Sequence, residues 1–272
     1  MAVPKAIMPI VNDDGYSRFL LHGDSGVGKT TLAAGSPDCL MLFNDPDEGR
    51  YAASQGTKAQ RWIVRDYNDL TEAIDYLKHA DHSFKWAWLD NASIFQDQGM
   101  DQIMEDLVAS KPHRSRWIPD KPEYLLNQQR LSFLIRELKS LPMNIGLICN
   151  SMAVEDEDGR TQIMPLFQGG QGAFSNKVCG LMGVVGYMEM RRVKSADGNS
   201  FTELPVLITN KTSKIYAKDR YGKIGTIQRP TMAKILEKIA PATGARKATG
   251  VGTKARPAVN KRQPTKRAAS TK

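Results

Sequence analysis

Cysteine is scarce in this 272-residue chain, which contains only Cys39, Cys149 and Cys179 and no Cys-x-x-Cys pair. An odd number of widely spaced cysteines argues against a disulfide framework and against a zinc site. Long apolar runs are also missing, because the longest, residues 181–188, is far shorter than the roughly 18 residues that cross a bilayer. The first residues lack the basic and apolar regions of a secretory signal. We therefore expect a cytoplasmic protein that does not enter a membrane.

Acidic residues are absent from residues 241–272, which contain nine Lys or Arg residues. The rest of the chain is balanced, with 29 basic and 29 acidic residues, so the net charge of +9 arises in this tail. The tail also has no aromatic residue and few large aliphatic ones, so it cannot bury enough apolar surface to offset the entropy cost of folding. We expect a globular domain over residues 1–240 and a disordered basic tail over 241–272. The tail either tethers nucleic acid in a salt-dependent way or only aids solubility.

Short apolar runs alternate with amphipathic helical stretches in residues 1–240, which predicts an α/β fold with a mostly parallel central sheet flanked by helices. Asp69 and Glu72 fit the capping box of a helix that starts at Leu70. A C-terminal β-hairpin is expected from 187–194 and 201–209 around a turn at 196–199, and a last helix at 230–240 has Pro230 in its first turn. The other expected strands are 18–22, 39–43, 61–64, 86–89, 144–149 and 183–188, and the other expected helices are 29–34, 70–78, 94–109 and 124–141.

A glycine-rich phosphate-binding loop is the most specific motif of the chain. The run Gly23-Asp24-Ser25-Gly26-Val27-Gly28-Lys29-Thr30 fits Gly-x-x-x-x-Gly-Lys-[Ser/Thr] and lies between a predicted strand and a predicted helix. Its glycines let backbone N–H groups surround phosphate oxygens at the positive end of the helix dipole. In this motif Lys29 reaches the β- and γ-phosphates, Thr30 holds Mg²⁺, and Thr31 is expected near the α-phosphate. The loop predicts binding of a nucleoside triphosphate with Mg²⁺.

Acidic residues follow two of the predicted strands. Asp90 ends the apolar run 85–90 and resembles a Walker B acid, which holds the metal directly or through water; its alternative role is to cap the helix near Ile94. Glu48 follows the strand 39–43, where an acid would face the γ-phosphate and deprotonate or orient water. Asp47 is the second candidate for this base. The alternative for residues 44–49 is a solvated turn.

Together, the phosphate loop, Asp47-Glu-Gly49, Asp90 and the segment Ala217-Lys-Asp-Arg-Tyr-Gly222 resemble the RecA-like P-loop ATPases over about residues 15–240. Within that group the chain is most similar to the phage nucleotide-binding proteins that act as single-strand annealing ATPases in recombination. The resemblance implies ATP as the nucleotide and Glu48 as the catalytic glutamate. It also implies that Lys218 and Arg220 reach the γ-phosphate of a neighbouring subunit in a homo-oligomer. A surface turn is the alternative for residues 218–222.

Asn150 follows the predicted strand 144–149, where the family places a polar sensor of the γ-phosphate. Other members often have Gln or His there, and the alternative for Asn150 is a strand-ending turn residue. The resemblance further implies single-stranded DNA contacts from two loops. The favoured loop, 110–124, combines cations that can follow phosphates with aromatic rings that can stack on bases, namely Lys111, Arg114, Arg116, Lys121 and Trp117. The acidic turn of the other loop, 151–177, is unfavourable for phosphates, and either loop has a lid or subunit contact as its alternative.

The predicted function is that of a DNA-stimulated ATPase that binds single-stranded DNA in phage-type recombination, annealing or replication. Its location would be the host cytoplasm if a phage encodes it, and a single-strand-binding protein is a candidate partner. Two alternatives remain open: a small-molecule phosphotransferase, since the phosphate loop alone fits one, and an ATP-gated DNA-binding module with little turnover. A replicative helicase or its loader has less support, because no long extra domain is evident.

Overall fold

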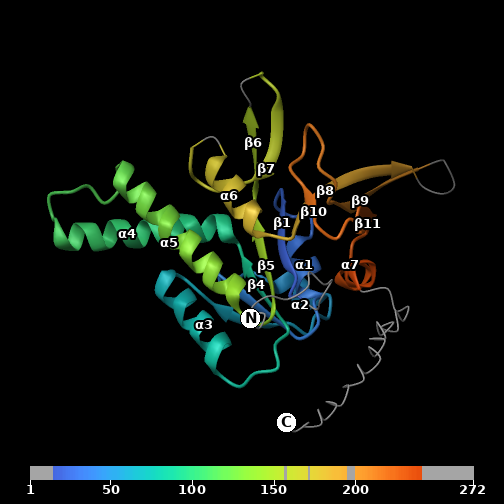
Figure 1. Ribbon diagram of the computed structural model, residues 1–272, viewed down its shortest axis with the longest axis horizontal. Coiled ribbons are helices and arrows are strands. Elements are labelled where there is room, and N and C mark those ends of the chain that lie inside the picture. The colour runs from blue at the N-terminus through green and yellow to red at the C-terminus, as the bar shows by residue number, and fades with distance from the viewer. Residues whose placement is uncertain (1–14, 156–157, 171, 195–199, 241–272) are drawn as a thin grey trace, which may run out of the picture. The chain divides into compact units, whose positions relative to one another are not determined.

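A nine-stranded, mostly parallel sheet forms the centre of the protein in a computed structural model, which describes residues 15–155, 158–170, 172–194 and 200–240 (Figure 1). The strand order is β11-β9-β8-β1-β5-β4-β2-β3, with β10 paired to β8. Neighbours from β8 to β3 are parallel, and β9, β10 and β11 join as antiparallel strands. The strands are β1 (Arg18–Gly23), β2 (Cys39–Phe43), β3 (Gln60–Ile63), β4 (Trp86–Asp90), β5 (Asn144–Cys149), β8 (Val184–Lys194), β9 (Phe201–Ile208), β10 (Lys218–Asp219) and β11 (Thr226–Gln228). The predicted α/β fold is confirmed.

Helices cover both faces of this sheet. On one face, strand residues such as Leu20 and Leu147 pack against α3 (Tyr67–His79), α4 (Ala92–Ser110), α5 (Lys121–Ser140) and α6 (Ala173–Leu181). On the other face, residues such as Phe19 and Ile148 pack against α1 (Lys29–Ala34), α2 (Arg50–Ser54) and α7 (Met232–Ile239). This division follows from the alternation of side chains along a strand. The apolar strands are therefore buried on both faces, and polar residues such as Asp90 and Asn150 lie at their carboxyl ends.

Trp88 holds strand β4, which ends in Asp90, in place by packing against β5 and by a hydrogen bond to the residues after α1. Its ring lies over Gly146 of the neighbouring strand β5, where an added Cβ would come within 2.0 Å of an indole carbon. The indole N–H donates a hydrogen bond of 2.9 Å to the hydroxyl of Ser36, just after α1. Since both groups are buried, this bond ties β4 to the helix that follows the phosphate loop.

Helix α3 begins earlier than predicted. Its N-cap is Asp66, whose carboxylate accepts hydrogen bonds of 2.8 Å from two backbone N–H groups of the first turn. The predicted capping box of Asp69 and Glu72 is therefore wrong. Asp69 lies inside the helix, and its carboxylate accepts a hydrogen bond from the backbone N–H of Arg65 at 2.9 Å.

Two further helix starts differ from their predictions. Thr231 is the N-cap of α7 and accepts from the Lys234 N–H at 3.3 Å, so Pro230 precedes the helix and is not in its first turn. Helix α4 has Asn91 as its N-cap, with the side chain accepting from Ser93 N–H at 2.9 Å. Asp90 therefore does not cap α4, and this alternative for it is wrong.

The segment 151–177 is more ordered than a loop. Its described residues form a separate antiparallel pair, β6 (Ser151–Glu155) and β7 (Thr161–Pro165), followed by α6. Helix α2 and the short strands β10 and β11 were also not predicted. The predicted C-terminal hairpin is confirmed as β8 and β9, while its turn at 196–199 and the tail 241–272 lie outside the described residues. Among the described helices, none has the length and apolar character that a membrane span needs.

Candidate functional site

The phosphate loop connects β1 to α1 in a conformation that depends on glycine. Gly28 has a φ of 94°, in the left-handed region, and an added Cβ there would meet no atom within 4 Å. At Gly23, by contrast, a Cβ would lie 2.2 Å from the backbone oxygen of Met188, because β1 and β8 pair at this point. The loop is thus anchored at one end and surrounds open space at the other, which fits bound phosphate groups.

Lys29 is buried beneath this loop, with only 7% of its surface exposed. Its ammonium donates hydrogen bonds to the backbone oxygens of Gly23 at 2.9 Å and Asp24 at 2.7 Å. An ammonium has three donors, so one remains for a phosphate oxygen. Burial lowers the pKa of Lys29, against the opposing charge of nearby Asp90. The Val27 side chain, in contrast, packs in the apolar core.

Thr30 and Asp90 form the contact expected of a magnesium site. The Thr30 hydroxyl donates a hydrogen bond of 2.6 Å to Asp90 Oδ2. Asp90 is 2% exposed, and burial raises its pKa to about 6, although the Thr30 hydrogen bond and the Lys29 charge act to lower it. A hydroxyl and a carboxylate are ligands that Mg²⁺ accepts beside nucleotide phosphates, so these residues fit the metal.

Glu48 faces a cavity of about 520 Å³ that the phosphate loop, Asp90 and Asn150 also line. It is half-buried, and burial raises the pKa of its carboxyl to about 7, with the charges of Asp90 and Asp45 adding to the shift and Lys29 opposing it. Within the described residues Glu48 has no ion pair. Asp47 also borders the cavity, but it is exposed and forms an ion pair with Arg50. The geometry favours Glu48 over Asp47 as the acid that faces the phosphates.

An asparagine network at the strand ends was not predicted. Asn91 donates from its side chain to Asn150 Oδ1 at 3.0 Å, and its backbone N–H donates to Asn44 Oδ1 at 2.7 Å. The Asn150 backbone N–H donates to Ser93 Oγ at 3.1 Å. Asn44 Nδ2 is buried without a partner among the described residues. The available signal was that β2, β4 and β5 are parallel strands whose carboxyl ends meet at one edge.

Two residues of the unpredicted helix α2 also line this cavity. Arg50 and Tyr51 follow Gly49, and Tyr51 is 70% exposed. The cavity is further lined by Ser25, Gly26, Gly28 and Thr31 of the predicted phosphate site. The structure thus brings together Lys29 and Thr30 of α1, Glu48, Asp90 and Asn150 from four separate segments.

Lys218 and Arg220 lie away from this cavity. Lys218 donates from Nζ to the backbone oxygen of Cys179 at 2.9 Å, and Arg220 donates to that of Gly180 at 3.3 Å, both at the end of α6. Strand β10 pairs Lys218 with Val185, toward the amino ends of the parallel strands and not beside the phosphate loop. Their role in a neighbouring subunit stays a prediction.

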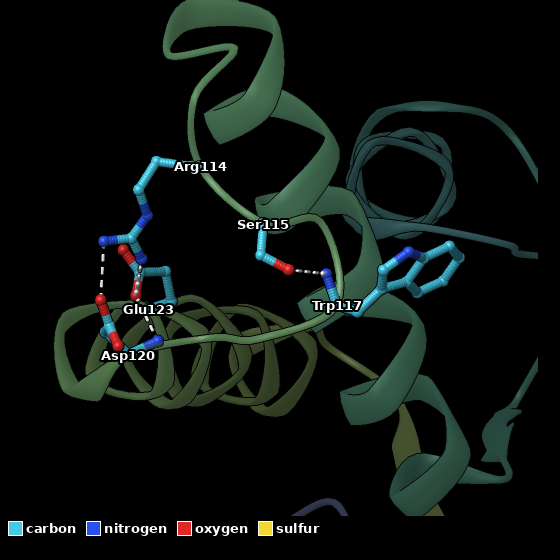
Figure 2. A network of polar contacts seen from close by, with 5 residues as sticks. All are labelled: Arg114, Ser115, Trp117, Asp120 and Glu123. Carbon is cyan, nitrogen blue, oxygen red and sulfur yellow. Dashed lines mark hydrogen bonds and ion pairs between the residues drawn. The ribbon is translucent and has the colours of Figure 1, made fainter.

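The predicted DNA loop lies between α4 and α5, where its arginines already have acidic partners (Figure 2). Arg114 forms ion pairs with Asp120 at 2.6 Å and Glu123 at 3.4 Å. The Glu123 carboxylate also accepts the Asp120 backbone N–H at 2.7 Å, at the start of α5. Arg116 forms an ion pair with Glu105. Much of the arginine charge is therefore used within the protein.

Trp117 is the exposed feature of the same loop, with 80% of its surface accessible. Its indole projects away from the Arg114 cluster in Figure 2, and the Arg116 guanidinium lies 5.2 Å from the ring centroid. Lys111 and Lys121 are exposed at the two ends of the loop. The five predicted nucleic-acid residues thus share one loop, but they differ in how much charge is available to a ligand.

A family described as an AAA domain matches residues 16–221, a range that contains the phosphate loop, Glu48, Asp90 and the segment of Lys218 and Arg220. No curated protein matches the chain.

Proposed function

The chain belongs to the AAA domain family of P-loop ATPases, and from that premise we propose that it hydrolyses ATP in a cycle coupled to single-stranded DNA. The biological setting that we propose is phage-type recombination, annealing or replication. The observation that carries the ATPase part of the proposal is the cavity of about 520 Å³ on which Lys29, Thr30, Asp90 and Glu48 converge. Phosphate binding, metal binding and activation of water can each be assigned to residues of this cavity.

Lys29 binds a phosphate oxygen with its remaining N–H donor, and the loop backbone binds others. Thr30 and Asp90 would hold Mg²⁺, which neutralises phosphate charge when bound. Glu48 orients the attacking water and accepts its proton. A base with a pKa of about 7 is well matched to this task near neutral pH, because it is partly ionised and still basic enough to take a proton. The Asn150 amide, held by Asn91, senses the terminal phosphate in this proposal, which is supported by its place in the lining of the same cavity.

We further propose that the protein acts as a homo-oligomer in which Lys218 and Arg220 reach the γ-phosphate of a neighbouring subunit. Their distance from their own cavity supports this arrangement, since basic groups that act in trans belong on a surface. For DNA, the support is the exposed Trp117 ring flanked by Lys111 and Lys121, which can stack on a base and contact phosphates.

The test is ATP turnover by the purified protein with and without single-stranded DNA, alongside Lys29→Ala and a version truncated to residues 1–240. We expect DNA to stimulate turnover, Lys29→Ala to abolish it, and the truncation to report what the tail adds. If DNA binds at low salt, more tightly with ATP than without it, but turnover stays negligible, the protein is an ATP-gated binding module. If DNA neither binds nor changes turnover, the DNA role is wrong, and small phosphate acceptors become the substrates to test.

A further inference from the structure

Strand β8 continues beyond the carboxyl end of its neighbour β1, where the phosphate loop begins. It pairs with β1 as far as Met188, which lies opposite Gly23, and then runs on with β9 alone as its partner (Figure 1). We call residues 189–194 and 201–205 the β8–β9 arm. Because the arm starts where Gly23 lies against the backbone of Met188, it projects from the same edge as the nucleotide cavity.

One face of this arm combines basic and aromatic side chains. The register places Arg192 opposite Glu203 and Lys194 opposite Phe201, and side chains two apart along a strand share a face. The Arg192 guanidinium lies over the Phe201 ring, 4.2 Å from its centroid, and the residue Phe201 is 56% exposed. Met190, 45% exposed, lies on the same face.

The cations of this face are available to a ligand. Within the described part of the chain, neither Arg192 nor Lys194 has an ion pair, although Glu203 lies opposite Arg192 in the register. On the other face, Arg191 is paired with Glu189 at 2.5 Å. The arginines of the α4–α5 loop resemble Arg191 and not Arg192, since Arg114 and Arg116 both form ion pairs with acidic residues. With two cations against the one acid Glu203, this face of the arm therefore has a positive excess, and its cations form no ion pair within the described part of the chain.

We propose that this face of the β8–β9 arm binds single-stranded DNA. The proposal rests on the DNA role proposed above and adds a binding surface to it. A guanidinium plane and an exposed ring can stack on the faces of unpaired bases, while Lys194 and Arg192 contact the phosphates between them. Bases in a duplex do not expose those faces, so the chemistry selects a single strand. A strand bound here lies on the continuation of the β-strand beside the phosphate loop.

The test measures the affinity of the full-length protein for a fluorescent oligothymidylate over a range of salt concentrations. Phe201→Ala should weaken binding by about 5-fold or more, because stacking on one base is lost. Arg192→Ala with Lys194→Ala should weaken binding at low salt and make the slope of log affinity against log salt shallower by about 1.4, or about 0.7 for each lost phosphate contact. The charge-matched control, Lys223→Ala with Lys238→Ala, changes two exposed lysines away from the arm and should keep the wild-type slope.

Circular dichroism and thermal melting identify any variant that fails to fold, and Phe201→Tyr, which keeps an aromatic ring, should restore most of the affinity. If the wild-type protein binds and the folded arm variants match it in affinity and salt slope, the arm is not a DNA contact, and the DNA role stands without it. If the wild-type protein does not bind the oligonucleotide at low salt, the DNA role and the arm proposal are both wrong.

Discussion

The nucleotide cavity and the α4–α5 loop both contain several charged residues, but these residues differ in burial and in whether they form ion pairs. In the cavity, Lys29 and Asp90 are buried and have no ion pair among the described residues, and burial is the largest cause of their pKa shifts. In the loop, Arg114 and Arg116 lie at the surface and are paired with acids. Lys29 and Asp90 interact with each other's charge but form no direct ion pair, so both can still bind a ligand, whereas surface arginines that are already paired have less charge to offer one.

The largest expected effect separates two adjacent acids that border the cavity. Glu48→Gln should lower ATP turnover by about 100-fold or more, because the general base is lost. Asp47→Asn, the matched control, removes an exposed carboxylate that is paired with Arg50, so turnover should stay within about 3-fold of wild type. Steady-state phosphate release measures both. The reverse ranking would assign the base to Asp47.

The next expected effect is on stability and concerns His22, which lies in β1 directly before the phosphate loop. His22 is fully buried before the phosphate loop, and burial lowers its pKa to about 4, so the ring is neutral. Nε2 must carry the proton, because it bonds the backbone oxygen of Tyr216 at 2.9 Å, which leaves Nδ1 to accept from the Ser151 hydroxyl at 2.9 Å. His22→Ala should reduce the free energy of unfolding by about 2–4 kcal/mol, through the cavity left by the buried ring and the loss of its two hydrogen bonds. Urea denaturation measures this, and a loss below about 1 kcal/mol would contradict it.

The pH dependence of stability tests the unpaired charge of Asp90. Its pKa rises from an ordinary value near 4 to about 6 on folding, so the folded state binds more protons between these values. The free energy of unfolding therefore falls as pH rises from about 4 to 6, by on the order of 1–3 kcal/mol. Asp90→Asn cannot ionise, so without nucleotide or Mg²⁺ it should lose the Asp90 part of the decline and be more stable than wild type at pH 8. Burial also raises the pKa of Glu48 to about 7, so a decline that Glu48 causes remains in the variant up to about pH 7. Unfolding curves at pH 4, 6 and 8 check this, and an unchanged decline in the variant would place its cause elsewhere.

What could be predicted from the sequence depended on whether a feature is formed by consecutive residues or by segments far apart in the chain. The phosphate loop was predictable because its function depends on backbone geometry over consecutive residues, which a local pattern encodes. Asn91 and Asn44 were missed because their contact joins two strands far apart in the chain. The acidic partners of Arg114 were visible in the sequence, but only the fold of the loop brings Asp120 and Glu123 to the same guanidinium.

The missed helices have a specific cause. Helices α2 and α6 begin after Gly49 and Gly172, which have φ values near 80° and provide no capping side chain. A search for Ser, Thr, Asp or Asn at a helix start cannot find such helices. The error at α3 is of the opposite kind, because three aspartates or asparagines precede Leu70 and the pattern selected Asp69 in place of Asp66. Local capping signals therefore predict that a helix is present better than they predict where it begins.

The smallest expected effect concerns the part of the loop that contributes least to stability. Trp117 is 80% exposed, so Trp117→Ala should change the free energy of unfolding by less than about 0.5 kcal/mol. Arg114→Ala should cost more, about 0.5–1 kcal/mol, because it leaves Asp120 and Glu123 without their cation at the start of α5. Urea denaturation compares the two, and equal costs would contradict the ranking. Since Trp117→Ala leaves the fold intact, any affinity for single-stranded DNA that it loses measures a contact with the ring itself.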